Sequence, residues 1–274
     1  MSPVIPNAVT PEPATPKIEF RDVSHSFDLG GETFAALDHV SLDIAEGEFV
    51  TVVGPSGCGK STLMNITAGL LDPQSGEVLV DGQPVRGPSP QRGVIFQQYA
   101  LFPWMTVRKN VEFGLKIAGV NAEERRRTAE RFIDMVGLSD FADALPKTLS
   151  GGMKQRCAIA RAYAVDPTIL LMDEPFGALD ALTRVQLQDR LLDTWSRERR
   201  TVLFITHDVD EAVYLANRVI VMAARPGRVH RVIDVDLPYP RTEDMRLSPE
   251  FAELRREVWH SVYHQPSPIE RTSP

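Results

Sequence analysis

The chain has 274 residues, 43% of them hydrophobic, which is enough for one large domain or two small ones. Its 30 basic and 37 acidic side chains give a formal net charge of −7, and an acidic chain is a poor candidate for binding nucleic acid. Two cysteines imply no disulfide framework and fit a reducing cytosol. No apolar run approaches the ~18 residues needed to span a bilayer, so any role at a membrane requires a partner.

The N-terminal segment is rich in proline and lacks the basic and apolar regions of a signal peptide, so residues 1–16 are predicted to form a disordered tail. Residues 18–27 and 39–44 alternate between apolar and polar side chains, which is typical of antiparallel strands. Short apolar runs predict three further strands, at 48–54, 76–82 and 92–97.

From about residue 98 to 166 the apolar side chains recur with helical periods. In the segment 122–138 one side is apolar and carries Phe132, Ile133, Val136 and Leu138. An apolar strand is predicted at 168–175, and the helix predicted at 181–200 has an apolar stripe of Leu182, Val185, Leu191 and Trp195. The runs at 201–207 and 218–237 predict the last strands. This order predicts an α/β fold with a helical insertion.

The segment GPSGCGKST lies between the strand at 48–54 and an amphipathic helix. It matches G-x-x-x-x-G-K-[ST], a phosphate-binding loop, in the strand–loop–helix context that the pattern requires. Its glycines let the backbone approach a ligand, and its N–H groups bind anions at the helix N-terminus. Lys60 is expected to reach the β- and γ-phosphates, Ser61 to bind Mg²⁺ and Thr62 to help hold the α-phosphate. The predicted phosphate site is Gly54, Pro55, Ser56, Gly57, Cys58, Gly59, Lys60, Ser61 and Thr62.

Two acids, Asp173 and Glu174, end the apolar strand ILLMDE. Asp173 can hold Mg²⁺ or its water opposite Ser61. Glu174 can polarise a water for attack on the γ-phosphate of a nucleotide. A strand followed by an acidic helix cap would explain one acid, but the phosphate loop upstream favours a nucleotide site.

The segment LSGGM predicts a second anion site, because Ser150 can cap a helix that begins at Gly151 and Gly152. With this motif in the same chain as the other two, the sequence resembles the ATP-binding subunits of ABC transporters from about residue 18 to 236. GPSGCGKST is similar to their Walker A motif, LSGGM to their signature and ILLMDE to their Walker B. GALD at 177–180 is similar to their D-loop.

The resemblance extends to His207 in FITHD, which matches the switch histidine, and to Gln97 in VIFQQ, which matches the Q-loop glutamine. It implies ATP hydrolysis with Mg²⁺, in a homodimer that packs each ATP between one chain's Walker A and the other's signature. Residues implied to act in cis are Lys60, Ser61, Thr62, Gln97, Asp173, Glu174 and His207. Gln97 is implied both in catalysis and in binding the metal. Residues implied at the dimer seam are Ser150, Gly151, Gly152 and Asp180.

The resemblance also implies an aromatic side chain that stacks on adenine. Phe27 fits this role best and Phe34 is the rival, and either can instead be a core residue. Cys58 lies inside the phosphate loop, where the N–H groups and Lys60 are expected to favour its thiolate. Cys157, on the helix after the signature, is expected to be a buried structural thiol.

The implied architecture is a P-loop NTPase core, a mixed sheet with an antiparallel β subdomain, and an inserted α-helical subdomain. The ATPase domain is expected over 17–240, with a catalytic core of 17–97 and 166–240 and a helical subdomain of 98–165. A short helical segment is expected at 241–274.

Leu101, Phe102, Pro103 and Trp104 follow Gln97, and an apolar surface there would dock a short helix of a membrane permease. Together with the segments 173–195 and 206–229, this stretch resembles importers of nitrate, alkanesulfonates, taurine and related small anions. Such an importer implies a separate permease, a substrate-binding protein and a peripheral position on the cytoplasmic face of the inner membrane. The alternatives are an exporter ATPase and a non-transport ABC ATPase that acts on DNA or ribosomes. A P-loop kinase is disfavoured, because it has no reason to carry LSGGM.

Overall fold

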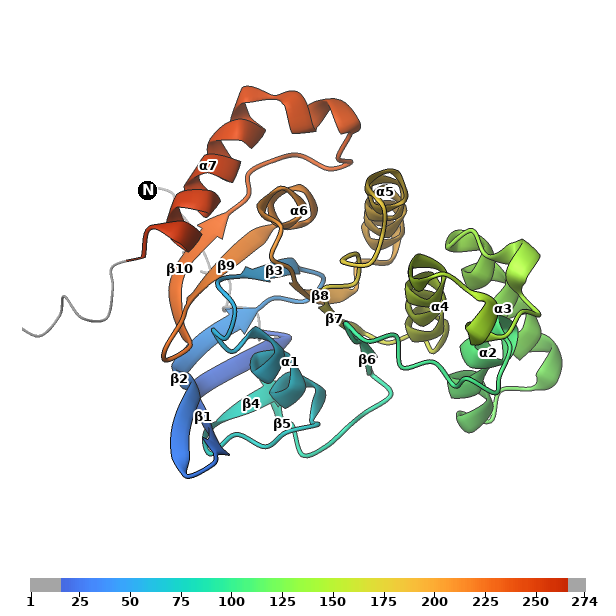
Figure 1. The fold of residues 1–274 in the computed structure, drawn as a ribbon, viewed down its shortest axis with the longest axis horizontal. Coiled ribbons are helices and arrows are strands. Elements are labelled where there is room, and N and C mark those ends of the chain that lie inside the picture. Colours follow the sequence, from blue (N-terminus) through green and yellow to red (C-terminus); the bar gives the residue numbers. More distant parts are fainter. Residues whose placement is uncertain (1–15, 266–274) are drawn as a thin grey trace, which may run out of the picture.

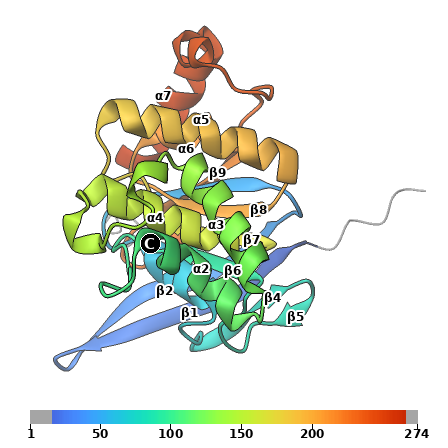
Figure 2. The same ribbon diagram turned by 90° about the vertical axis from the view of Figure 1, so that its right-hand side faces the viewer.

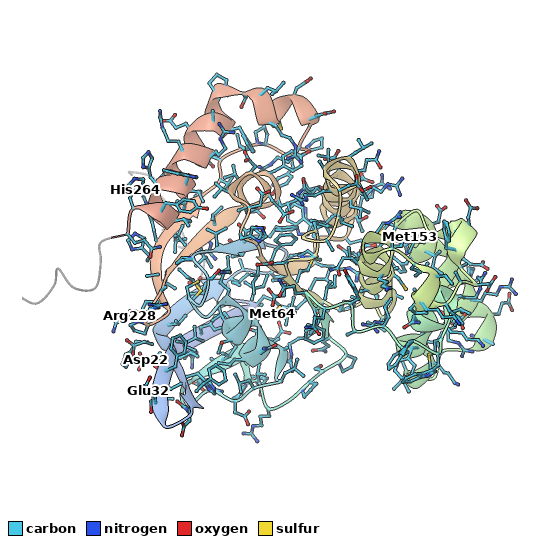
Figure 3. All side chains as sticks on the ribbon, in the orientation of Figure 1. Asp22, Glu32, Met64, Met153, Arg228 and His264 are labelled. Atoms are coloured by element: carbon cyan, nitrogen blue, oxygen red, sulfur yellow. The ribbon has the colours of Figure 1, made fainter. Side chains whose placement is uncertain are left out.

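The computed structural model describes residues 16–265, whose strands form two sheets (Figure 1). The predicted tail of residues 1–16 lies, apart from Pro16, outside the described residues. The smaller sheet is antiparallel, with the strand order β2-β1-β4-β5. Its strands are β1 Ile18–Leu29, β2 Glu32–Ile44, β4 Ser75–Val80 and β5 Gln83–Pro84. The β1–β2 hairpin projects from the body, with Glu32 near its end (Figures 2 and 3).

The larger sheet has the strand order β10-β9-β3-β8-β7-β6. Its strands are β3 Phe49–Val53, β6 Arg92–Ile95, β7 Ile169–Asp173, β8 Thr201–Ile205, β9 Arg218–Ala223 and β10 Arg228–Asp234. Five of these strands are parallel, and β10 joins the edge of β9 antiparallel. Because the strands run parallel, their carboxyl ends lie along one edge of the sheet.

Side chains of the larger sheet alternate between two buried layers. In β8, Val202 and Phe204 pack on one face, whereas Leu203 and Ile205 pack on the other. Helix α1, Lys60–Ala68, and the antiparallel sheet cover the second face, and Met64 of α1 lies in the middle of the molecule (Figure 3). Burial on both faces explains why these strands read as continuous apolar runs in the sequence.

Three helices form one group beside the larger sheet (Figures 1 and 2). They are α2 Val107–Ile117, α3 Ala122–Met135 and α4 Gly151–Ala164. Two short 3₁₀ turns, Ser139–Phe141 and Pro146–Thr148, lie between α3 and α4. The apolar side predicted for the segment 122–138 is confirmed, because Phe132, Ile133, Val136 and Leu138 are all buried. No helix within residues 16–265 is both long and apolar enough to cross a membrane.

Helix α5, Ala181–Glu198, corrects one sequence prediction. Leu182 is 69% exposed and does not belong to the apolar stripe. It lies about two and a half helical turns before Leu191, which places the two side chains on opposite faces of the helix. The apolar core face instead contains Leu187, Leu191, Leu192 and Trp195.

The C-terminal part of the chain returns over the body beside α6, Val209–Leu215 (Figure 1). It comprises a 3₁₀ segment η3, Glu243–Leu247, and helix α7, Pro249–Tyr263. Ser248 caps α7 by accepting a hydrogen bond from the Phe251 N–H at 3.1 Å. Phe251 and Val258 are buried, and α7 packs against α6 and β9, so this segment shares the core of the larger sheet.

Candidate functional site

The phosphate loop joins the end of β3 to the start of α1 and is held in a conformation that needs glycine. Gly59, the residue that caps α1, has φ 87°, and a Cβ there would lie 2.4 Å from the Ala36 carbonyl oxygen. At Gly54 a Cβ would lie 2.6 Å from the Met222 carbonyl oxygen. A side chain at either position would therefore clash with backbone. The neighbouring strands β2 and β9 fix the shape of the loop.

Lys60 lies across this loop. Its Nζ donates hydrogen bonds to the carbonyl oxygens of Gly54 at 2.9 Å and Pro55 at 3.1 Å. Ser56 and Gly57 form the exposed outer part of the loop, and Thr62 lies in the first turn of α1. The ammonium group and the helix N-terminus together give the loop the positive field that a phosphate requires.

Asp173 and Ser61 meet at the carboxyl end of β7. Asp173 is 8% exposed, and its carboxylate accepts a hydrogen bond from the Ser61 hydroxyl. Burial raises the pKa of Asp173 above its ordinary value, while the Ser61 hydrogen bond and the Lys60 charge act in the opposite direction. A carboxylate beside a hydroxyl is the kind of oxygen pair that Mg²⁺ prefers.

Glu174 follows Asp173 in a left-handed conformation, with φ 46°. Its carboxylate accepts a hydrogen bond from Gln97 Nε2 at 3.0 Å and lies 3.3 Å from His207 Nδ1. The three side chains come from the turns that follow β6, β7 and β8. Backbone strain at a residue other than glycine is common at functional sites. The structure thus brings together the glutamate, glutamine and histidine that the sequence predicted as catalytic.

The predicted signature residues lie apart from the phosphate loop. Ser150 caps α4 by accepting a hydrogen bond from the Met153 N–H at 3.3 Å, and Met153 marks this helix in Figure 3. A Cβ at Gly151 would lie 2.9 Å from the Tyr99 hydroxyl, so the signature touches the segment after Gln97. Within residues 16–265, no hydrogen bond or ion pair joins the signature to the phosphate loop.

Asp180 caps α5 by accepting a hydrogen bond from the Thr183 N–H at 3.0 Å. The hydrogen bonds from Thr183 hold the pKa of Asp180 below its ordinary value. The turn before it lies beside the signature, because a Cβ at Gly152 would lie 3.0 Å from a methyl group of Leu179. The signature and the D-loop therefore form one surface.

Phe27 and Phe34 are direct cross-strand partners on the β1–β2 hairpin. Their side chains therefore share one face of the sheet. Phe27 is 38% exposed, and its ring packs edge-on against His25 with centroids 4.7 Å apart. Phe34 is half-buried. Both rings border the same surface, and the more exposed Phe27 offers the larger free face for stacking.

The expectation that the loop favours a Cys58 thiolate is wrong. The Cys58 side chain is fully buried in the apolar layer that also contains Val52, Met64 and Met222, and its Sγ accepts a hydrogen bond from Lys60 Nζ at 3.6 Å. Burial raises the pKa of the Cys58 thiol, and the Lys60 ammonium opposes this effect only in part. Only the Cys58 backbone can therefore face a phosphate. Cys157 is a buried thiol as predicted, and burial raises its pKa to about 12.

The structure also contains a buried acid that the sequence analysis missed. Glu211 of α6 is 4% exposed and lines a small cavity of about 10 Å³ together with Glu174 and His207. The sequence gives little signal for this burial, because Glu211 follows Asp210 in the first turn of α6, where acidic residues commonly lie exposed and favour the helix N-terminus.

Comparisons with known proteins agree with these motifs. The sequence pattern of the family described as "ABC transporter" matches residues 37–177. The chain belongs to this family. The assembled Walker A, Walker B and histidine turns are those of an ABC ATPase, an enzyme that hydrolyses ATP in connection with transport.

Several relatives cover most of this ABC ATPase. A Brucella abortus (strain 2308) protein, provisionally named as an ATP-binding protein, is 73% identical over 91% of this chain and 95% of its own length. A nitrate import ATP-binding protein of Synechocystis is 49% identical over 88% of this chain and 93% of its own. An aliphatic sulfonates import ATP-binding protein of Bacillus cereus is 44% identical over 88% of this chain and 94% of its own length.

The fold has also been solved in a relative. A dimeric ATP-binding cassette in a post-hydrolysis state, bound to ADP and Pi, matches 81% of this chain and all of its own. The TM-score is 0.73 and the sequence identity is 35%. The α/β fold, with its antiparallel sheet and its group of helices, is therefore that of an ABC ATPase cassette.

The raised pKa of Asp173 gives a prediction of opposite effects on stability and activity. Above its folded pKa the buried carboxylate costs free energy, so Asp173→Asn should leave the Tm of the nucleotide-free protein equal or higher at pH 7, and this difference should vanish in acid. Hydrolysis of ATP should fall by about 10²-fold or more, because a magnesium ligand is lost.

Asp180→Asn is the matched control for this variant. The pKa of the Asp180 carboxyl is lowered in the folded chain, so its negative charge stabilises the fold and loss of that charge should not raise the Tm. Asparagine caps a helix about as well as aspartate does, so any fall in Tm should be small. Thermal unfolding by circular dichroism and phosphate release measure the two effects. A Tm for Asp173→Asn well below that of the wild type would show that Asp173 is needed for folding.

The burial of both cysteines predicts that the folded chain resists alkylation. In a Cys157→Ser variant at pH about 8, Cys58 should react at least about tenfold more slowly than a free thiol, because it is inaccessible and its pKa is raised. In urea it should react at the rate of a free thiol. Mass spectrometry of the modified protein measures both rates. Fast labelling that Mg-ATP prevents would contradict the buried position of Cys58.

Proposed function

We propose that this ABC ATPase powers the import of a small anion such as nitrate, an alkanesulfonate or taurine. The proposal is supported by the two import ATP-binding proteins among its relatives, one for nitrate and one for aliphatic sulfonates, which match nearly the whole ATPase. These two relatives serve different anions at similar identity. The class of small anions is therefore proposed here, and the individual anion depends on the partner proteins.

The proposed hydrolytic site is the cluster at the carboxyl ends of β3, β7 and β8. The observation that carries it is the joint contact of Glu174 with Gln97 and His207, beside the Ser61–Asp173 pair. In this proposal Glu174 acts as general base on the attacking water, and His207 orients that water and the γ-phosphate. The Glu174 carboxylate already accepts a hydrogen bond from Gln97, so its lone pairs have a fixed direction.

The residues present fit a magnesium ion, because a carboxylate and a hydroxyl already meet in the site. Ser61, Asp173 and Gln97 would hold it. When bound, it would neutralise charge on the phosphates. Lys60 would place its ammonium group on the β- and γ-phosphates, and the loop from Gly54 to Thr62 would bind the remaining phosphate oxygens through its N–H groups.

We also propose a head-to-tail homodimer in which Ser150, Gly151 and Gly152 reach the partner's ATP. The proposal is supported by the dimeric state of the similar cassette structure and by the separation of the signature from the phosphate loop within one chain. The N-terminus of α4, capped by Ser150, suits a phosphate of the partner's nucleotide. Asp180 lies beside the signature and would join the same seam.

The proposed dock for a permease is the loop that carries Trp104. Trp104 is 72% exposed, and its ring packs against Phe102 with centroids 5.8 Å apart. Asn110 of α2 holds the loop in place by accepting a hydrogen bond from the Phe102 N–H and donating to the Met105 carbonyl. An exposed aromatic side chain on a rigid loop is a common anchor for a partner helix.

A groove of about 560 Å³ runs beside this loop and is lined in part by Tyr99, Leu101, Pro103 and Lys154. Its mixed apolar and basic lining suits a short amphipathic helix of a permease. In this proposal the permease spans the inner membrane, a substrate-binding protein delivers the anion from the outer side, and the ATPase docks on the cytoplasmic face. Uptake of labelled nitrate and alkanesulfonates by cells with and without the gene tests the import function directly, and unchanged uptake of every anion in this class would count against it.

Glu174→Gln is predicted to trap an ATP-bound dimer. Loss of the general base should slow hydrolysis by about 10²–10⁴-fold, while Lys60 and the metal ligands still bind ATP. Size-exclusion chromatography with Mg-ATP should then show a dimer that persists. Glu253→Gln is the control, because Glu253 lies exposed on α7 far from these contacts. A Glu174→Gln protein that hydrolyses ATP at the wild-type rate would exclude this residue as the base.

Trp104→Ala is predicted to spare ATP binding and to impair assembly with the permease. Truncation of an aromatic anchor at an interface typically costs about 2 kcal/mol or more. Co-purification with the permease measures the effect, with Trp259→Ala on α7 as a matched exposed tryptophan. Wild-type recovery of the complex by the Trp104 variant would place the dock elsewhere.

A further inference from the structure

A chain of polar side chains runs from the C-terminal segment into the core. Arg246 of η3 donates a hydrogen bond from Nη2 to Gln188 Oε1 at 2.6 Å. Gln188 of α5 then donates from Nε2 to Glu211 Oε1 at 2.8 Å. Gln188 is 2% and Glu211 4% exposed, so the link between them is shielded from water, whereas the link from the half-buried Arg246 is shielded only in part. Hydrogen bonds in such an environment fix the positions of their partners more firmly than those on the surface.

The same chain continues from Glu211 to the turn that carries His207. The Thr206 hydroxyl donates a hydrogen bond to the Glu211 carboxylate and accepts one from the Asp208 N–H at 3.0 Å. Thr206 is 2% exposed. Because Thr206 and Asp208 flank His207, these bonds hold the backbone of His207 from both sides. The small cavity between Glu211, Glu174 and His207 lies at the end of this chain.

The buried position of Glu211 is costly for the fold and therefore needs an explanation. Burial raises the pKa of Glu211, while its hydrogen bonds to Thr206 and Gln188 act in the opposite direction. A buried ionic network gains little stability over well-packed apolar side chains, so stability alone does not explain Glu211 at this position. The N-terminus of α6 is already capped by Asp208, which accepts from the Glu211 N–H at 3.1 Å. The helix thus has its cap without the Glu211 side chain.

Arg246 is the link through which the C-terminal segment reaches this network. Its guanidinium stacks over the Tyr214 ring, 3.5 Å from the centroid, and Tyr214 in turn donates a hydrogen bond to Asp189 at 2.7 Å. The neighbouring Leu247 is 86% exposed and adds little packing. Arg246 therefore does more than Leu247 to hold η3 on the body, and its removal would loosen both η3 and Gln188.

We propose that Arg246, Gln188 and Glu211 are positioning residues that hold His207 against Glu174, so that the segment 243–247 sets the rate of ATP hydrolysis. This inference rests on the proposed roles of Glu174 and His207. The residues touch neither nucleotide nor water in this scheme, and they act only through the turn at Thr206. A displaced η3 would release Gln188, weaken the hold of Glu211 on Thr206 and let His207 move away from the carboxylate.

The first test is the Arg246→Met variant of the full chain, which removes the guanidinium and keeps an apolar side chain over Tyr214. We expect kcat to fall by about threefold to tenfold, a typical effect of a change along such a path, with KM for ATP changed by less than about twofold. Arg246→Lys should recover part of the loss, because lysine can still donate to Gln188.

The matched control is Arg255→Met. Arg255 also joins the C-terminal segment to α6, through an ion pair with Asp210 at 3.3 Å, but it does not contact Gln188. Its kcat should stay at the wild-type value. If Arg255→Met lowers kcat as much as Arg246→Met does, general loosening of α7 is the cause and the proposal is wrong.

The decisive readout is a double-mutant cycle with His207→Ala. If the network acts through His207, Arg246→Met should lower kcat in the wild-type background and change nothing in the His207→Ala background. Equal effects in both backgrounds would overturn the proposal. A second cycle pairs Gln188→Leu with His207→Ala. Its effects on kcat should also be non-additive, since Gln188 acts through His207 on the same path.

The cycle also separates this inference from the function on which it rests. Normal hydrolysis by His207→Ala would refute the proposed role of His207 itself. A strong loss in His207→Ala together with an unchanged kcat in Arg246→Met would refute only the positioning network. The Tm of every variant is measured together with its kcat. A fall in kcat seen only in variants that are partly unfolded at the assay temperature counts against the proposal.

Discussion

The hydrogen-bond register between three parallel strands, β3, β8 and β7, determines where the phosphate loop, the Asp173–Glu174 pair and His207 lie relative to one another. Val52 of β3 is paired with Ile205 of β8, which is paired with Asp173 of β7. The ladder continues past the strand ends, because the Glu174 N–H donates to the Ile205 carbonyl at 2.9 Å and the Thr206 N–H to the Val52 carbonyl at 3.2 Å. A slip of one residue would move a turn by about 3.3 Å, which is enough to break the contacts of Glu174.

The site places two carboxylates, Asp173 and Glu174, where an anionic nucleotide is proposed to bind. Burial and the repulsion between these negative charges together explain the raised pKa of Asp173, and the repulsion explains the need for a cation. Glu174 raises the pKa of the neighbouring Asp173, adding to the effect of burial. Lys60 is the cation that acts on Asp173 from the phosphate loop. A divalent cation would relieve the repulsion, so the proposed magnesium site and the acidic pair explain each other. The folded chain accepts this cost at neutral pH because the geometry serves a ligand.

The sequence predicted the parts of this structure that depend on local pattern. The phosphate loop, the acid pair and the buried strands follow from glycine spacing and from apolar runs, and their element types agree with the structure. One error came from three-dimensional context and the other from a helical spacing that was counted too loosely. Cys58 lies in a basic loop, but its side chain turns to the apolar layer, which no local pattern shows. Leu182 fits a loose count of apolar residues, but not the helical angle of the stripe.

The contact between Gln188 and Arg246 could not be predicted, because it joins segments 58 positions apart in the chain. An amide has no periodicity of its own, so Gln188 does not differ in the sequence from a surface residue. Gln97 meets Glu174 across 77 positions, and only the resemblance of VIFQQ to a Q-loop indicates its role. Only the strand order, with β6 beside β7, puts the turn after β6 next to the acid pair.

The segment from Gln97 to Trp104 shows how short the path between a permease and the hydrolytic site can be in the proposed transporter. Gln97 contacts Glu174, Tyr99 lies against the signature at Gly151, and Trp104 faces solvent. Arg161 of α4 donates hydrogen bonds to the carbonyls of Ala100 and Tyr99, at 2.6 and 3.4 Å. Helix α4 is therefore bonded directly to this segment, so Trp104 is connected to both Glu174 and the signature through a run of only a few residues.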